Sequence, residues 1–145
     1  MKVVIQRVET ANVSVNQKIV GKIDQGLLLL VGFTNGDSEK EIDWMVNKIA
    51  NLRIFDDDNG VMNLSVKEIK GEILSVSQFT LYADSRKGNR PSYINALGGG
   101  DAIKLYEKFN IKLRETGIKI EEGIFAADMK VSLVNDGPIT IILEK

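Results

Sequence analysis

Two short stretches of the chain combine side chains and backbone groups that could do chemistry. The first is Ser77-Gln78-Phe79-Thr80-Leu81, which closes a run typical of a β-strand and leads into a loop. Polar side chains and N–H groups that leave a sheet at a strand end can form the wall of a polar pocket. An amphipathic strand with its polar residues facing outward explains the same pattern, and the pattern alone favours that simpler interpretation.

The second stretch is Asn135-Asp136-Gly137-Pro138-Ile139-Thr140, whose residue types demand a tight turn of the chain. One interpretation is a hairpin turn between two final strands. The other is a cis Gly137-Pro138 peptide, which would aim two carbonyl groups in nearly the same direction. Only about 5–6% of X-Pro bonds in folded proteins are cis, so the residues alone leave both interpretations open.

The composition excludes several kinds of chemistry. The chain contains no cysteine and no histidine, which rules out a disulfide, a thiolate nucleophile, a Cys/His zinc site and a Ser-His-Asp triad. Any catalysis must then use carboxylates, lysines, hydroxyls, backbone groups or chemistry supplied by the substrate. No phosphate-loop or dinucleotide-binding motif is present, and the acidic turn Asp56–Gly60 does not match a calcium loop. We therefore expect no cofactor and no metal.

Basic residues gather on a Gly-rich loop and on a predicted helix. The loop carries Arg86, Lys87 and Arg90, and the helix carries a basic stripe made of Lys104, Lys108 and Lys112. A phosphate-contacting surface is the functional interpretation, and a solvated loop and helix face are the simpler one. The formal net charge of −1 gives no overall attraction to nucleic acid, so such contact needs a local patch.

The 145 residues, of which 43% are hydrophobic, predict one domain over residues 1–145. The run from Leu27 is apolar without interruption, which is typical of a strand buried on both faces. β-Branched and alternating apolar residues predict strands at Lys2–Val8, Asn12–Val15, Ile19–Ile23, Leu27–Phe33, Glu72–Phe79, Lys130–Val134 and Ile139–Leu143.

Two helices are predicted between these strands. The first begins at Ser38, with Glu41 at capping-box spacing, and carries Arg53 near its C-terminal end. The second is capped by Asp101 and ends at Gly117. Their inward-facing residues are Ile42, Met45, Ile49 and Leu52, then Ile103, Tyr106, Phe109 and Leu113. Many strands with two helices predict an α+β fold, in which mostly antiparallel, hairpin-built sheets support two main helices.

The sequence gives no sign of a membrane or an export route. The first residues lead straight into a predicted strand, without the apolar segment of a secretory signal. The longest apolar run, Leu27 to Val31, is far shorter than the roughly 20 residues that span a bilayer. We therefore expect a cytoplasmic protein.

Both chemical stretches resemble the two signature motifs of the D-aminoacyl-tRNA deacylase family. The first motif extends from Ser77 to Asp84, and the second from Asn135 to Thr140. The similarity covers essentially the whole chain and includes Val4–Val8, Lys87–Ser92 and Phe125–Met129. Because both motifs occur in the right order and at the right spacing, the match is specific.

The resemblance implies a homodimeric α+β protein that hydrolyses the ester between a D-amino acid, or glycine, and the 3′-terminal adenosine of tRNA. It implies that Gly137-Pro138 is cis, enters the active site of the partner subunit and acts as a chiral filter. Ser77, Gln78, Phe79 and Thr80 would form the catalytic pocket floor. Met129, Phe125 and Arg7 would join Gly137 and Pro138 among the substrate-binding residues.

A mechanism without histidine follows from these expectations. Rigid backbone at Gly137-Pro138 would fill the space that an L side chain needs, whereas glycine has no side chain to reject. The backbone N–H groups of Phe79 and Thr80 would stabilise the oxyanion, and the neighbouring ribose hydroxyl of the substrate would activate water. The competing hypothesis makes Thr80 a covalent nucleophile, although no base is evident nearby in the sequence.

Two other classes of function stay open at this point. A non-catalytic tRNA-binding module would use the basic stripe and would show salt-dependent binding without ester loss. A hydrolase of free small esters would cleave D-amino acid esters that lack RNA just as fast.

Overall fold

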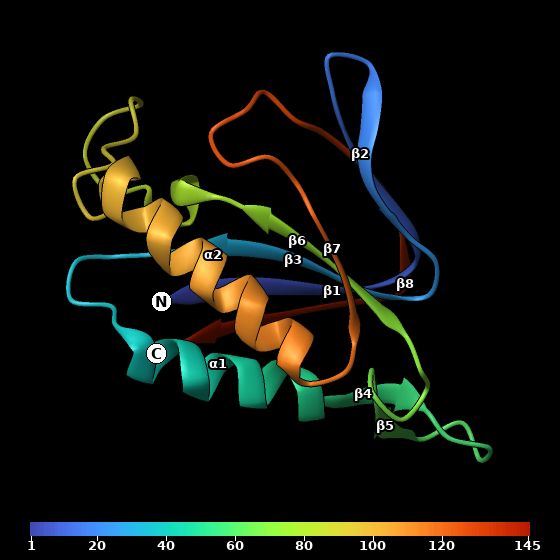
Figure 1. Ribbon diagram of the computed structural model, residues 1–145. Helices are drawn as coiled ribbons and strands as arrows, with labels where there is room; N and C mark the ends of the chain where they lie inside the picture. Colours follow the sequence, from blue (N-terminus) through green and yellow to red (C-terminus); the bar gives the residue numbers. More distant parts are fainter.

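The computed structural model covers residues 1–145 and confirms the α+β architecture (Figure 1). One mixed sheet has the strand order β2-β1-β3-β6-β7, with β8 paired to β1, and a small second sheet consists of β4 and β5. The strands are β1 (Lys2–Val15), β2 (Lys18–Ile23), β3 (Gly26–Gly32), β4 (Arg53–Asp56), β5 (Met62–Ser65), β6 (Glu72–Ser77), β7 (Lys119–Glu122) and β8 (Lys130–Glu144). The helices are α1 (Glu39–Asn51), α2 (Gly99–Glu115) and a 3₁₀ turn, η1 (Phe79–Tyr82).

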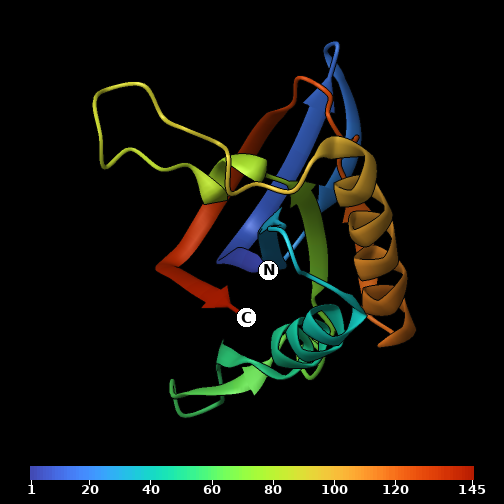
Figure 2. The same ribbon diagram turned by 90° about the vertical axis from the view of Figure 1, so that its left-hand side faces the viewer.

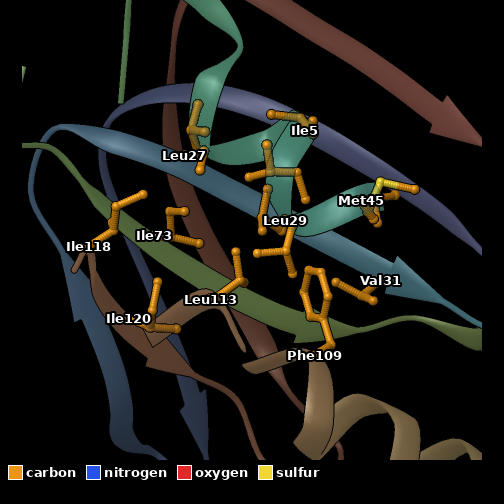
Figure 3. Packing of buried hydrophobic residues seen from close by; sticks show 14 of the residues in the cluster. Ile5, Leu27, Leu29, Val31, Met45, Ile73, Phe109, Leu113, Ile118 and Ile120 are labelled. Atoms are coloured by element: carbon orange, nitrogen blue, oxygen red, sulfur yellow. The ribbon is translucent and has the colours of Figure 1, made fainter. Parts of the chain in front are cut away.

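The sheet buries apolar residues on both faces. The larger core lies between the sheet and the two α-helices, where Phe109 of α2 lies beside Leu29 and Val31 of β3 (Figure 3). A smaller core on the opposite face contains Leu28 of β3 and Leu74 of β6. Alternate residues of β3 therefore enter different cores, as expected for its uninterrupted apolar run.

The pairing pattern differs from a purely hairpin-built sheet. β1 pairs antiparallel with β2, β3 and β8, but β3 pairs parallel with β6, and β6 pairs parallel with β7. β7 was not predicted, because only Ile120 is apolar among its four residues. The predicted strands Lys2–Val8 and Asn12–Val15 form one continuous strand, since β1 extends without a break.

The two helix starts depend on different contacts. At α1 the capping box is confirmed, because the Ser38 hydroxyl accepts a bond from the Lys40 N–H and Glu41 accepts one from the Ser38 N–H. At α2 the predicted cap is wrong: Gly98 occupies the N-cap, and Asp101 lies inside the first turn. The position expected for Arg53 is also wrong, since it starts β4 and donates to the Asn63 carbonyl.

β8 is a single strand, so the hairpin interpretation of residues 135–138 is wrong and the cis interpretation is confirmed. Val8 of β1 pairs with Asn135 and Gln6 pairs with Thr140, which leaves four residues of β8 opposite Arg7. This bulge contains the cis Gly137-Pro138 peptide. Because proline has no N–H to contribute to a ladder, it is tolerated in a bulge where a regular strand would exclude it.

The basic stripe of α2 faces α1 and is largely neutralised by it. Lys108 and Lys112 lie 2.5 and 2.8 Å from the Glu39 carboxylate, and Lys112 also pairs with Asp43. Lys104 pairs with Asp101 at 3.0 Å. Lys108 and Lys112 therefore connect the two helices, whereas Lys104 pairs within α2, in agreement with the simpler interpretation of the stripe.

Neither α-helix has the length and apolar character that spanning a membrane requires.

The Glu39 contacts predict a pH dependence of stability. Hydrogen bonds from Lys108 and Lys112 lower the pKa of Glu39 from 4.5 to about 2. Its stabilising effect should therefore be complete above pH 4.5 and disappear as the pH falls towards 2. Chemical denaturation should show Glu39→Gln less stable than the wild type at pH 7, with the difference vanishing near pH 2. Glu107→Gln, at an exposed acid of α2 without an ion pair, should show no such trend; an equal trend would contradict the assignment.

Candidate active site

A largely apolar cavity of about 500 Å³ opens where β3 and β6 end beside the first turn of α2. Five of the residues predicted for the site line it, namely Ser77, Gln78, Phe79, Phe125 and Met129. The other lining residues are Val31, Gly32, Phe33, Val76, Leu97, Gly99, Ala102, Ala126, Ala127 and Val131. The fold thus brings the first chemical stretch together with the segment that follows β7.

The start of η1 supplies two unpaired backbone donors beside this cavity. The Gln78 N–H still bonds to the Val31 carbonyl at 2.7 Å, and the chain then leaves the sheet. The first N–H groups of any helical turn have no partner within it. Accordingly, the N–H groups of Phe79 and Thr80 precede the first hydrogen bond of η1 and have no acceptor within it, whereas the next N–H, that of Leu81, bonds to the Gln78 carbonyl. Two adjacent free donors can stabilise a developing negative charge on oxygen.

The Thr80 hydroxyl has no base beside it. It accepts a hydrogen bond from the Gln78 side-chain amide, which cannot take up a proton. Thr80 lies outside the cavity lining as a whole residue, which does not distinguish its hydroxyl from its N–H. The missing base is what favours backbone chemistry at Phe79 and Thr80 over nucleophilic attack by the Thr80 side chain.

Arg7, Gly137 and Pro138 form a second cluster, away from this cavity. Arg7 is only 6% exposed, and its Nε lies 2.9 Å from Asp136 Oδ2 while its NH1 donates to the Ile54 carbonyl. The Asn135 side chain accepts a bond from the Ile139 N–H at 3.0 Å. These contacts hold the bulge from both ends, but its exposed tip at Gly137 and Pro138 does not line the cavity of its own chain.

The sequence pattern gives no role to Asp136, although this residue lies inside the second motif. A signal for its function was present in β1, where Arg7 is the one arginine in an otherwise mostly apolar run. A charge that becomes buried needs a partner. The sequence could not identify that partner, because it lies on β8, at the other end of the chain.

Among the loop cations, Arg86 is paired and two others are not. Arg86 forms a two-pronged contact with Asp84, which lowers the pKa of that carboxyl to about 2. Lys87 and Arg90 form no ion pair. Their loop projects from the body of the molecule beyond η1 (Figure 2), so any phosphate contact at this end depends on these two side chains.

The backbone of Gly137 has a conformation that residues with a side chain adopt only with strain. Its φ is +118°, and a Cβ there would lie 2.8 Å from Ile139 Cγ1 and 3.0 Å from the Ile139 nitrogen. We expect Gly137→Ala to destabilise the fold by about 2–3 kcal/mol, because a steric clash adds to the left-handed strain. Gly88→Ala, at φ +71° in open space, should cost only about 1 kcal/mol. Equal midpoints in urea would show that the clash relaxes freely.

Comparisons with known proteins place this geometry in a family. The profile of the family described as D-Tyr-tRNA(Tyr) deacylase matches residues 4–144. A D-aminoacyl-tRNA deacylase of Flavobacterium psychrophilum is 59% identical over 145 residues, which cover 99% of this chain and 97% of that protein. One of Geotalea daltonii is 57% identical over 144 residues, covering 99% and 96%.

A solved structure has the same fold. The structure of a protein named c-Myc DNA unwinding element binding protein has a TM-score of 0.94 to this chain at 42% identity, covering 100% of this chain and 99% of that one. The resemblance carried by the two motifs is thereby confirmed over the whole chain. The chain belongs to the D-aminoacyl-tRNA deacylase family and, like the relatives of that name, is an enzyme of the hydrolase class.

Proposed function

We propose that this protein hydrolyses the ester bond between a D-amino acid and the 3′-terminal adenosine of tRNA. The similarity to deacylases over the full chain supports this function. The observation that carries it is the pair of N–H groups at the start of η1, on Phe79 and Thr80, beside a cavity lined by residues of the first motif and of the Phe125–Met129 segment. A cytoplasmic location fits such a substrate.

The reaction uses backbone donors and a hydroxyl of the substrate. Water adds to the ester carbonyl, and the N–H groups of Phe79 and Thr80 stabilise the resulting oxyanion. One such donor contributes about 10²–10³ in kcat. The ribose 2′-hydroxyl beside the ester assists the attacking water, because no side chain at the site is a suitable base. The ester C–O bond then breaks, and the 3′ oxygen of the tRNA leaves with a proton.

Chirality is selected by exclusion rather than by attraction. A pocket that bound each side chain would accept few amino acids, whereas backbone that blocks one direction accepts any D residue. We assign this role to Gly137 and Pro138, which Arg7 and Asn135 hold in place. Glycine has no side chain in the blocked direction, so the same filter admits glycyl-tRNA.

The proposed filter needs a second copy of the chain. Gly137 and Pro138 are exposed and do not line their own cavity, so a homodimer would supply them to the cavity of the partner. Exposed apolar side chains support such an interface, with Val134 and Ile142 on β8 and Phe79, Tyr93 and Ile94 near η1. Isolated apolar residues are common on surfaces, but two of these lie on β8, the strand that also carries Gly137 and Pro138, which supports an interface there.

A non-catalytic nucleic-acid-binding module is the second candidate. The name of the structural relative with 42% identity, a DNA-element binding protein, is the observation that favours it. The ion pairs of Lys108 and Lys112 with α1 argue against a binding module, because they leave few unpaired cations to contact nucleic-acid phosphates.

A deacylation assay separates these functions. We expect D-Tyr-tRNA to be hydrolysed at least about a hundredfold faster than L-Tyr-tRNA, since roughly 3 kcal/mol of steric exclusion produces that ratio. Thr80→Ala should retain activity within about tenfold, because its backbone N–H remains. A tRNA ending in 2′-deoxyadenosine should resist hydrolysis.

Each contrary result has a distinct meaning. Salt-dependent tRNA binding without ester loss would support the binding module. Equally fast cleavage of a free D-tyrosine ester would indicate a small-ester hydrolase. Loss of all activity in a folded Thr80→Ala variant would favour the side-chain nucleophile, and normal cleavage of the 2′-deoxy substrate would exclude assistance by the ribose.

A further inference from the structure

The carbonyl oxygen of Ser75 joins three parts of the chain that surround the cavity. It accepts the N–H of Gly123 at 2.9 Å and the hydroxyl of Tyr106, also at 2.9 Å. Ser75 is on β6, Tyr106 is on α2, and Gly123 directly follows β7. Ser75 is completely buried and Tyr106 is 3% exposed, so water does not compete for these bonds.

Each of these parts continues into a wall of the cavity. β6 runs from Ser75 through Ser77 to the free N–H groups at the start of η1. The segment after Gly123 carries Phe125 and Met129, and α2 contributes Ala102, one helical turn before Tyr106. A shift at the Ser75 carbonyl therefore moves the two sides of the cavity relative to each other.

The Tyr106 ring adds a second contact with the same wall. It packs against the Phe125 ring, with 5.8 Å between the ring centroids. Burial raises the pKa of Tyr106, so its hydroxyl keeps its proton through the neutral range and remains a donor. The Tyr106 side chain thus bonds to the strand that leads to the Phe79 and Thr80 donors and packs against Phe125, which lines the same cavity.

We propose that Tyr106 is a positioning residue, whose hydroxyl and ring fix the distance between the Phe79–Thr80 donors and the Phe125–Met129 wall. This inference rests on the proposed deacylase function for its kinetic consequence. The structural consequence of the inference is independent of the proposed function, because the hydrogen bonds of the Ser75 carbonyl exist whatever reaction the protein catalyses.

Tyr106→Phe is the test, since it removes the hydroxyl and keeps the ring against Phe125. The variant should fold, because α2 is also held to β7 by Asn110 and Arg114, which both bond to Glu122. Ser65→Ala is the matched control. Ser65 is 4% exposed, its hydroxyl bonds to Glu68, and it lies on β5 at the other end of the molecule (Figure 1). Each variant should lower Tm by about 3–5 °C.

The kinetic readout is the split between kcat and KM on D-Tyr-tRNA. We expect Tyr106→Phe to lower kcat about five- to tenfold while KM changes less than about twofold, because misplaced oxyanion donors weaken only the transition state. Ser65→Ala should leave both constants unchanged. If the kcat of Tyr106→Phe stays within about twofold of the control, the positioning role is refuted.

Hydrogen exchange tests the same claim without any activity. In Tyr106→Phe the Gly123 amide should exchange at least about tenfold faster than in the wild type, whereas in Ser65→Ala its rate should stay the same. Unchanged exchange at Gly123 in Tyr106→Phe would overturn the proposal. If the wild type hydrolyses no D-aminoacyl-tRNA, the proposed function fails, and this measurement alone then decides the role of Tyr106.

Discussion

The site depends on one constraint at the end of β6. The chain stays hydrogen-bonded to β3 up to the N–H of Gln78 and then turns at once into η1. Since a strand pairs its N–H groups and a helical start does not, this change of structure frees the donors of Phe79 and Thr80. Rigid core packing behind β6 holds them in place. A protein without histidine or cysteine can in this way stabilise negative charge without a reactive side chain.

The other part of the proposed site, Gly137 and Pro138, lies away from the cavity of the same chain. The bulge of β8 is fixed by the buried Arg7 through Asp136, and its tip faces outward. An exposed, rigid backbone tip has little use in a monomer. It fits the proposed homodimer, in which each cavity would be completed by the other subunit, so that association, chirality and catalysis would depend on the same few residues.

Local signals in the sequence predicted much of the local structure, apart from the Asp101 cap and the position of Arg53, and long-range pairing accounts for the error at β8. The capping box at Ser38 and the buried run of β3 depend on neighbouring residues, and both are confirmed. The segment around Gly137 was open to a hairpin interpretation because the residue types of a bulge and a turn are alike, and only pairing with β1 distinguishes them. The family resemblance named five of the residues that line the cavity, but the partner of Arg7 and the junction at Ser75 join distant segments and became visible only in three dimensions.

The most direct test of the central claim is a crystal structure with a non-hydrolysable D-tyrosyl-adenosine analogue. The account predicts its carbonyl oxygen within about 3 Å of both the Phe79 and the Thr80 nitrogen, with Gly137 and Pro138 of a second subunit against its α-carbon. A carbonyl oxygen directed away from both nitrogens, with the carbonyl carbon instead beside the Thr80 hydroxyl, would contradict it.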